Sequence, residues 1–194
     1  KLELLPLDYC ASLLSRKSGH PVKITYSRQE VFSCTRRKHP MIYKIKSGVK
    51  SDGEIVAIQG EVIADGGAYC SYGPTILAAA IMRIFMVYKI KNIRITGYRI
   101  YTNNPICGAM RGFGGVQSGF AIESHMDMLA EGIRMDPVEF RLKNATDPDM
   151  VTVNKMVISS NGLKECIEKA RDACGWKEKF GKQKDKNRGI GIGI

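Results

Sequence analysis

The sequence predicts an α+β fold, a layered domain in which long antiparallel strands pack against helices. Two long stretches, residues 41–50 and 55–64, alternate apolar and polar side chains and flank an Asp-Gly turn. This is the pattern of half-buried strands joined as a hairpin. Other stretches repeat apolar residues at helical spacing. Because strands and helices come in separate runs, the pattern favours α+β over a doubly wound parallel sheet.

The N-terminal third should begin with helices. Apolar residues recur at helical spacing over residues 7–18, and Gly19 follows where a helix C-cap belongs. A short strand is expected over residues 21–26. Ser27 and Glu30 then have the spacing of a capping box, so a second, short helix is expected to begin there.

The rest of the chain should add one long strand, over residues 93–101, and four helices. Asp136 and Pro137 supply an N-cap and a favoured first residue for one of these helices. The helices are expected over residues 77–87, from the glycine-rich stretch to about residue 133, from residue 137 to about 144, and over residues 163–174 before Gly175.

Composition excludes several classes of protein. The chain has 194 residues, 44% hydrophobic and 25% charged, which excludes a disordered or fibrous protein. The longest apolar run, residues 76–88, is interrupted by Arg83 and too short to span a membrane. The first ten residues of the chain resemble neither a natural start nor a signal peptide. The scattered cysteines and histidines match no metal motif, so we expect no metal site, reduced thiols and a cytoplasmic location.

The formal charge of +11 would permit nucleic-acid binding. The lysines, however, alternate with apolar residues along a strand or mix with acidic residues near the C-terminus. Such charges usually form a solvated surface, so nucleic acid is not expected as a partner. Docking of an acidic partner chain remains an alternative.

The stretch CGAMRGFGGVQSGFAIES, from Cys107 to Ser124, combines glycines with one arginine before a helix. Glycines let a ligand approach the backbone, helix N-termini attract anions, and the planar guanidinium of Arg111 suits phosphate. This pattern points to a phosphate-bearing cofactor. Gln117 occupies the position of the third glycine in a dinucleotide-binding motif, so that motif matches poorly. Alternatively, the glycines only turn the chain from strand to helix.

The series TYSRQEVFSCTRRKHP, DGEIVAIQGEVIADGGAY, YKIKNIRI, TNNPICGAMRGFGGVQ and MDPVEFRLKNA resembles the molybdopterin-binding large subunit of the xanthine dehydrogenase and aldehyde oxidase family. The resemblance covers nearly the whole chain, in the family's order. It implies that Arg111 lies against the molybdenum–pterin cofactor, and that Gly112, Gly114 and Gly115 allow the close approach. It also implies that Phe113 lines the substrate pocket; the alternative is that Phe113 belongs to the core.

Departures from the family bear on the substrate. Purine-oxidising relatives carry a substrate-binding arginine at the position of Ala79. The family's upstream glycine loop would end at Lys1, and Leu2 replaces the glutamate that follows it in purine oxidisers. Both losses weaken the case for a purine. Val116 replaces a proline, which is a smaller departure.

The resemblance further implies that residues 1–188 are part of the first molybdopterin-binding region and that residues 189–194 begin the next domain. The catalytic glutamate would lie beyond this chain, which would then hold no catalytic residue and be inactive alone.

The implied enzyme hydroxylates an aldehyde or N-heterocycle with water. It works with the remainder of the large subunit and with iron–sulfur and flavin groups on partner chains or domains. The alternatives are a reductive or carbon-monoxide-oxidising relative with the same cofactor, or a basic non-catalytic binding module.

Overall fold

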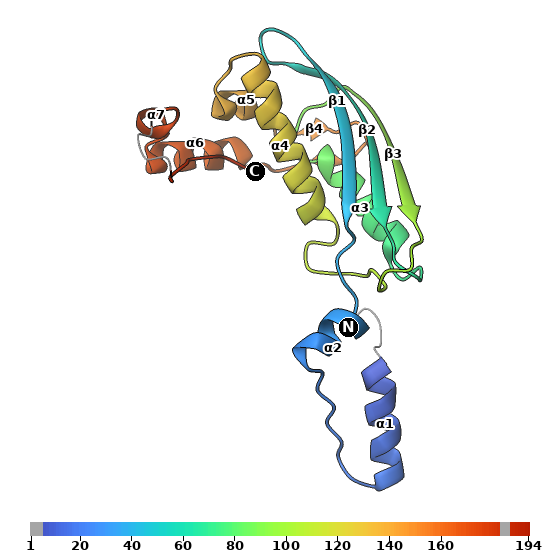
Figure 1. The fold of residues 1–194 in the computed structure, drawn as a ribbon. Coiled ribbons are helices and arrows are strands. Elements are labelled where there is room, and N and C mark those ends of the chain that lie inside the picture. The colour runs from blue at the N-terminus through green and yellow to red at the C-terminus, as the bar shows by residue number, and fades with distance from the viewer. Residues whose placement is uncertain (1–5, 183–186) are drawn as a thin grey trace.

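The computed structural model describes residues 6–182 and 187–194 of the chain. A three-stranded sheet with helices against one face forms the main body, and an arm containing two helices projects from one end of it (Figure 1). This architecture confirms the α+β class predicted from the sequence.

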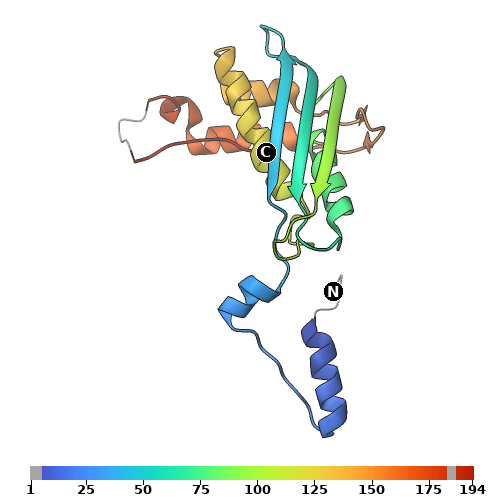
Figure 2. The same ribbon diagram turned by 45° about the vertical axis from the view of Figure 1, so that its right-hand side comes forward.

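The arm contains helices α1 (Pro6–Ser18) and α2 (Arg28–Cys34). The predicted first helix is confirmed, and so is the capping box. The hydroxyl of Ser27 accepts a hydrogen bond from the N–H of Glu30 (3.3 Å), and the Glu30 carboxylate accepts one from the N–H of Ser27 (2.7 Å). The predicted strand over residues 21–26 is wrong. These residues lie in the arm, away from the strands of the sheet, so their alternating pattern has no partner to pair with (Figure 2).

The sheet has the order β1–β2–β3. β1 (Met41–Val49) and β2 (Ile55–Asp65) pair antiparallel, with Lys44 opposite Glu61, as the Asp-Gly hairpin predicts. β3 (Asn92–Ile100) lies on the other side of β2 and runs parallel to it. The chain passes through a helix between these two strands, and such a crossover produces a parallel pair. The expected antiparallel pairing therefore holds for the first two strands, and the third strand is parallel.

Three helices cover one face of the sheet: α3 (Gly73–Ile84), α4 (Gly115–Gly132) and α5 (Pro137–Asn144). α3 exists as predicted but begins and ends earlier than residues 77–87. Pro74 favours the earlier start. The main core between helices and sheet contains Ile55, Ile58, Ile84, Tyr88, Ile122, Met126 and Phe140.

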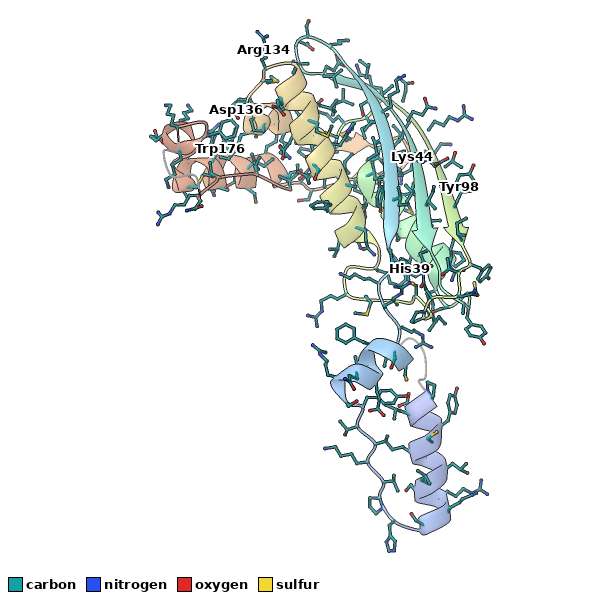
Figure 3. All side chains as sticks on the ribbon, in the orientation of Figure 1. His39, Lys44, Tyr98, Arg134, Asp136 and Trp176 are labelled. Atoms are coloured by element: carbon teal, nitrogen blue, oxygen red, sulfur yellow. The ribbon has the colours of Figure 1, made fainter. Side chains whose placement is uncertain are left out.

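The predicted N-cap of α5 is confirmed. The Oδ1 atom of Asp136 accepts hydrogen bonds from the N–H groups of Val138 (2.7 Å) and Glu139 (3.2 Å). Its Oδ2 atom accepts a third one from the indole N–H of Trp176 (2.9 Å), which joins the start of α5 to the C-terminal region (Figure 3).

The C-terminal region follows α5 as a short ribbon, β4 (Met150–Val151) and β5 (Val157–Ile158), and then helices α6 (Leu163–Cys174) and α7 (Trp176–Lys179). The predicted last long helix is confirmed. Beyond α7, isoleucines at every second position pack against a small core: Ile190, Ile192 and Ile194 against Val138, Ile167 and Trp176. The assignment of residues 1–188 and 189–194 to two domains stays a prediction.

Candidate functional site: the glycine loop on helix α3

Residues 108–115, which we call the glycine loop, lead into α4 on the chain that leaves β3. The loop turns tightly: the N–H of Phe113 bonds to the carbonyl of Met110, and that of Gly115 to the carbonyl of Gly112, both at 2.8 Å. Gly112 and Gly114 have φ angles of +93° and +91°, which glycine adopts without steric cost. No side chain caps α4, so the N–H groups of Val116 and Gln117 in its first turn can serve an external acceptor.

The glycine loop packs directly against α3. A Cβ atom on Gly114 would lie 2.6 Å from the carbonyl oxygen of Ile76 and 3.0 Å from the Cβ of Ala80. A Cβ atom on Gly115 would lie 2.5 Å from the Nη1 atom of Arg83. Because these two glycines have no side chain, the loop can contact α3 directly.

The structure brings most of the predicted site residues together. Arg111 is exposed and Phe113 is half-buried, both on the glycine loop. Ala79 is half-buried and lies on the face of α3 that meets the loop, because it follows Ile76 by one helical turn. The roles of these residues remain predictions. The departures noted at Lys1 and Leu2 lie outside the described residues.

Phe113 has a φ of +45°. This left-handed conformation costs a residue with a side chain about 1–2 kcal/mol, and such strain is often found at functional sites. The bonds on either side of Phe113 hold it in this conformation.

The glycine loop has an unbalanced positive charge. From Gly66 to Ile122 the sequence contains no aspartate or glutamate. Within the described part of the chain, the guanidinium groups of Arg83 and Arg111 make no hydrogen bond or ion pair, although most carboxylates elsewhere are paired with lysine or arginine. Two guanidinium groups beside the loop are thus available to an anionic ligand.

A polar layer fixes the segment that leads into the loop. Its centre is the carboxylate of Asp65, at the end of β2, which accepts hydrogen bonds from Thr102 (2.7 Å), Asn104 (2.8 Å), the N–H of Gly67 (2.9 Å) and Arg37 (2.7 Å). Partial burial acts to raise the pKa of Asp65, but these hydrogen bonds lower it overall. The charged carboxylate therefore joins the ends of β2 and β3.

His39 lies where the arm meets the sheet (Figure 3). Its side chain is 1% exposed, and neither ring nitrogen has a hydrogen-bond partner among the described residues. Burial, followed by the nearby charge of Arg99, lowers the pKa of His39, so the ring is neutral near pH 7. Its carbonyl accepts a hydrogen bond from the side chain of Gln117 (3.1 Å), in the first turn of α4. This bond ties the start of α4 to the chain segment before β1.

Arg83, Asp65 and His39 also belong to this region, although no local sequence pattern marks them. Arg83 was visible only as an interruption of an apolar run, and Asp65 only as a strand end. The one sequence signal of an anion-binding region was the absence of acidic residues from Gly66 to Ile122.

The donors of the glycine loop fit an anionic cofactor with a phosphate group. The loop supplies a guanidinium without a partner among the described residues, an uncapped helix start and glycines that permit close approach. The described residues contain no group of three histidine, cysteine or acidic side chains that could hold a metal ion. Within residues 6–182 and 187–194, no helix is both long and apolar enough to cross a membrane.

Comparison with known proteins identifies the family. Residues 1–145 match the family model described as molybdopterin cofactor-binding domain. The large molybdopterin subunit of nicotinate dehydrogenase from Eubacterium barkeri is 38% identical over 173 residues, covering 89% of this chain and 40% of that subunit. The molybdenum-binding subunit of xanthine dehydrogenase from Escherichia coli is 35% identical over 197 residues, covering 99% of this chain and 26% of the subunit.

Solved structures agree with this match. The aldehyde oxidoreductase from Desulfovibrio gigas superposes with a TM-score of 0.79 at 29% identity, covering 93% of this chain and 20% of that chain. The present chain thus spans less than half the length of these relatives. The family match covers more than half of the chain, and the chain belongs to the molybdopterin-binding domain family of the xanthine dehydrogenase and aldehyde oxidase enzymes.

Proposed function

We propose that this chain forms part of the active site of a molybdenum hydroxylase, an oxidoreductase that adds oxygen from water to an aldehyde or an N-heterocycle. The observation that supports this most is the packing of the glycine loop against α3. This packing and the hydrogen bonds within the loop hold Arg111 and Phe113 in one fixed segment. The relatives are named for nicotinate, xanthine and aldehyde substrates, which supports these two substrate classes.

In this proposal, Arg111, Gly112, Gly114 and Gly115 hold the molybdenum–pterin cofactor. The Arg111 guanidinium donates hydrogen bonds to an anionic group of the cofactor, and the loop glycines let it approach the backbone. When bound, the cofactor supplies the redox chemistry, in which R–H and H₂O give R–OH, two protons and two electrons. This chain binds and orients the reactants, and the general base belongs to another part of the large subunit.

Phe113 and Ala79 would line the substrate pocket. The half-buried ring of Phe113 offers a flat apolar wall against which an aromatic substrate can stack. The methyl group of Ala79 leaves the facing surface of α3 open. Together they would orient a flat substrate, which lowers the entropic part of the activation barrier.

The complete enzyme would contain the remainder of the large subunit and iron–sulfur and flavin groups on partner chains or domains. These groups would accept the two electrons released from the substrate. We propose a cytoplasmic location, and we expect the isolated chain to be inactive and to bind no cofactor stably, because one loop and one arginine do not enclose it.

Two variants of the complete enzyme test this proposal. Arg111→Ala removes charge-assisted hydrogen bonds that contribute about 1.5–3 kcal/mol each, so molybdenum content should fall. Phe113→Ala should leave molybdenum content unchanged but weaken or broaden substrate use. Metal content, melting temperature and turnover per bound molybdenum distinguish the effects. A Phe113→Ala enzyme that is destabilised by about 3–5 kcal/mol but turns over normally would show that Phe113 is only a core residue.

A further inference from the structure

Arg83 lies over the first residue of α4, beside the glycine loop. A Cβ atom on Gly115 would lie 2.5 Å from its Nη1 atom, 2.6 Å from its Cδ and 2.9 Å from its Cζ. Any side chain at Gly115 would therefore push the guanidinium away. The absence of that side chain lets Arg83 reach from the end of α3 to the same loop that carries Phe113.

The charge of Arg83 is not used within the described part of the chain. The Arg83 guanidinium forms no ion pair or hydrogen bond there, whereas the next two cations along the sequence, Lys89 and Lys91, bind Asp147 and Glu54. Arg111 adds a second positive charge without a carboxylate. A planar guanidinium with no acid beside it is suited to bind a carboxylate through two parallel hydrogen bonds.

The face of α3 that carries Arg83 also carries the residues that meet the loop. Ile76, Ala79 and Ala80 precede Arg83 by seven, four and three residues, so all four share one helical face. Ile76 and Ala80 contact Gly114. Ala79, half-buried, places only a methyl group beside Arg83. The loop covers Ile76 and Ala80, so a ligand group would meet this helix at Ala79 and Arg83, where Ala79 adds no long side chain.

We propose that Arg83 determines substrate specificity by binding the carboxylate of an aromatic or heteroaromatic acid whose ring packs on Phe113. This inference rests on the proposed function, because it needs a substrate seated at the glycine loop. It narrows the substrate from aldehydes and N-heterocycles in general to members of these classes that carry a negative charge. Arg83 acts in recognition and takes no part in the redox step.

The test compares charged and neutral probes on the complete, cofactor-loaded enzyme. The pairs are nicotinate with nicotinamide and formylbenzoate with benzaldehyde. In Arg83→Gln, KM for the charged probe should rise at least ~10-fold, because a hydrogen bond to a charged group is lost. The neutral probe should change by less than about 2-fold on the same scale. Arg83→Lys should recover part of the preference, since it keeps the charge but not the planar fork.

Arg94→Gln is the matched control, because it removes an exposed arginine without a described partner from the open face of β3. It should retain the wild-type preference. Calorimetric binding of nicotinate to the loaded enzyme gives a second readout, in which Arg83→Gln should bind at least ~10-fold more weakly.

Three results would overturn the role of Arg83: equal losses on charged and neutral probes, no loss on either, or a fall in molybdenum content in Arg83→Gln, which would assign the guanidinium to the cofactor. Failure of the proposed function is recognised separately. In that case the wild-type enzyme would transfer no oxygen from isotope-labelled water to any of the four probes, charged or neutral.

Discussion

Gly114 should be the least replaceable residue of the glycine loop. In Gly114→Ala the residue keeps a φ near +91°, which costs about 1–2 kcal/mol once a side chain is present. The new Cβ also lies 2.6 Å from the backbone oxygen of Ile76, so α3 must shift, and overpacking of this kind costs about 1–3 kcal/mol. The free energy of unfolding should therefore fall by about 2–5 kcal/mol. In a protein of this size that lowers Tm by roughly 4–20 °C.

Gly119→Ala is the matched control for this change. Gly119 lies inside α4, has no atom within 4 Å of its Cβ position and does not have a positive φ. Replacing it should raise stability by about 0.5–1 kcal/mol, since alanine favours a helix more than glycine does. Thermal and urea unfolding of both variants measures the difference. If Gly114→Ala melts within a degree or two of the wild type, the inferred contact between the loop and α3 is wrong.

Two further predictions concern the polar residues His39 and Asp136. Stability should decline as the pH falls below 6.5, the ordinary pKa of histidine, because His39 is held neutral in the folded chain while the unfolded chain takes up the proton. His39→Gln should flatten part of this decline in urea unfolding measured at several pH values, and an unchanged profile would contradict the assignment. Asp136→Ala should cost about 1–2 kcal/mol through the lost N-cap, and more through the unsatisfied indole N–H of Trp176. Asp136→Asn keeps a cap acceptor, so in thermal unfolding it should lose less, and equal losses would show that the cap contributes nothing.

Local signals were sufficient for most of the fold. The β1–β2 hairpin, the capping box of α2 and the N-cap of α5 depend on neighbouring residues, and all three are confirmed. The parallel pairing of β3 depends on where α3 returns the chain, which no local pattern records. Over residues 21–26 the local pattern predicted a strand that does not form, because alternation alone does not make a strand without a partner.

In the candidate site, too, only some of the residues could be predicted from the sequence. The glycine loop with Arg111 could be recognised from its composition and from the resemblance to a family. Arg83 and His39 could not, because they meet the start of α4 only through the packing of α3 and of the segment before β1. Neighbours in space that are far apart in sequence leave no periodic signal in a single chain.

The exposed helix α1 of the N-terminal arm should allow assembly to be followed by hydrogen exchange. No residue of α1 is buried, and Tyr9, Leu13 and Leu14 are each about half exposed or more. An isolated helix of 13 residues is only marginally stable in water. In this chain alone its backbone amides should therefore exchange with deuterated solvent almost as fast as those of an unfolded peptide. Slowed exchange confined to α1 would report the moment at which another part of the enzyme covers those leucines.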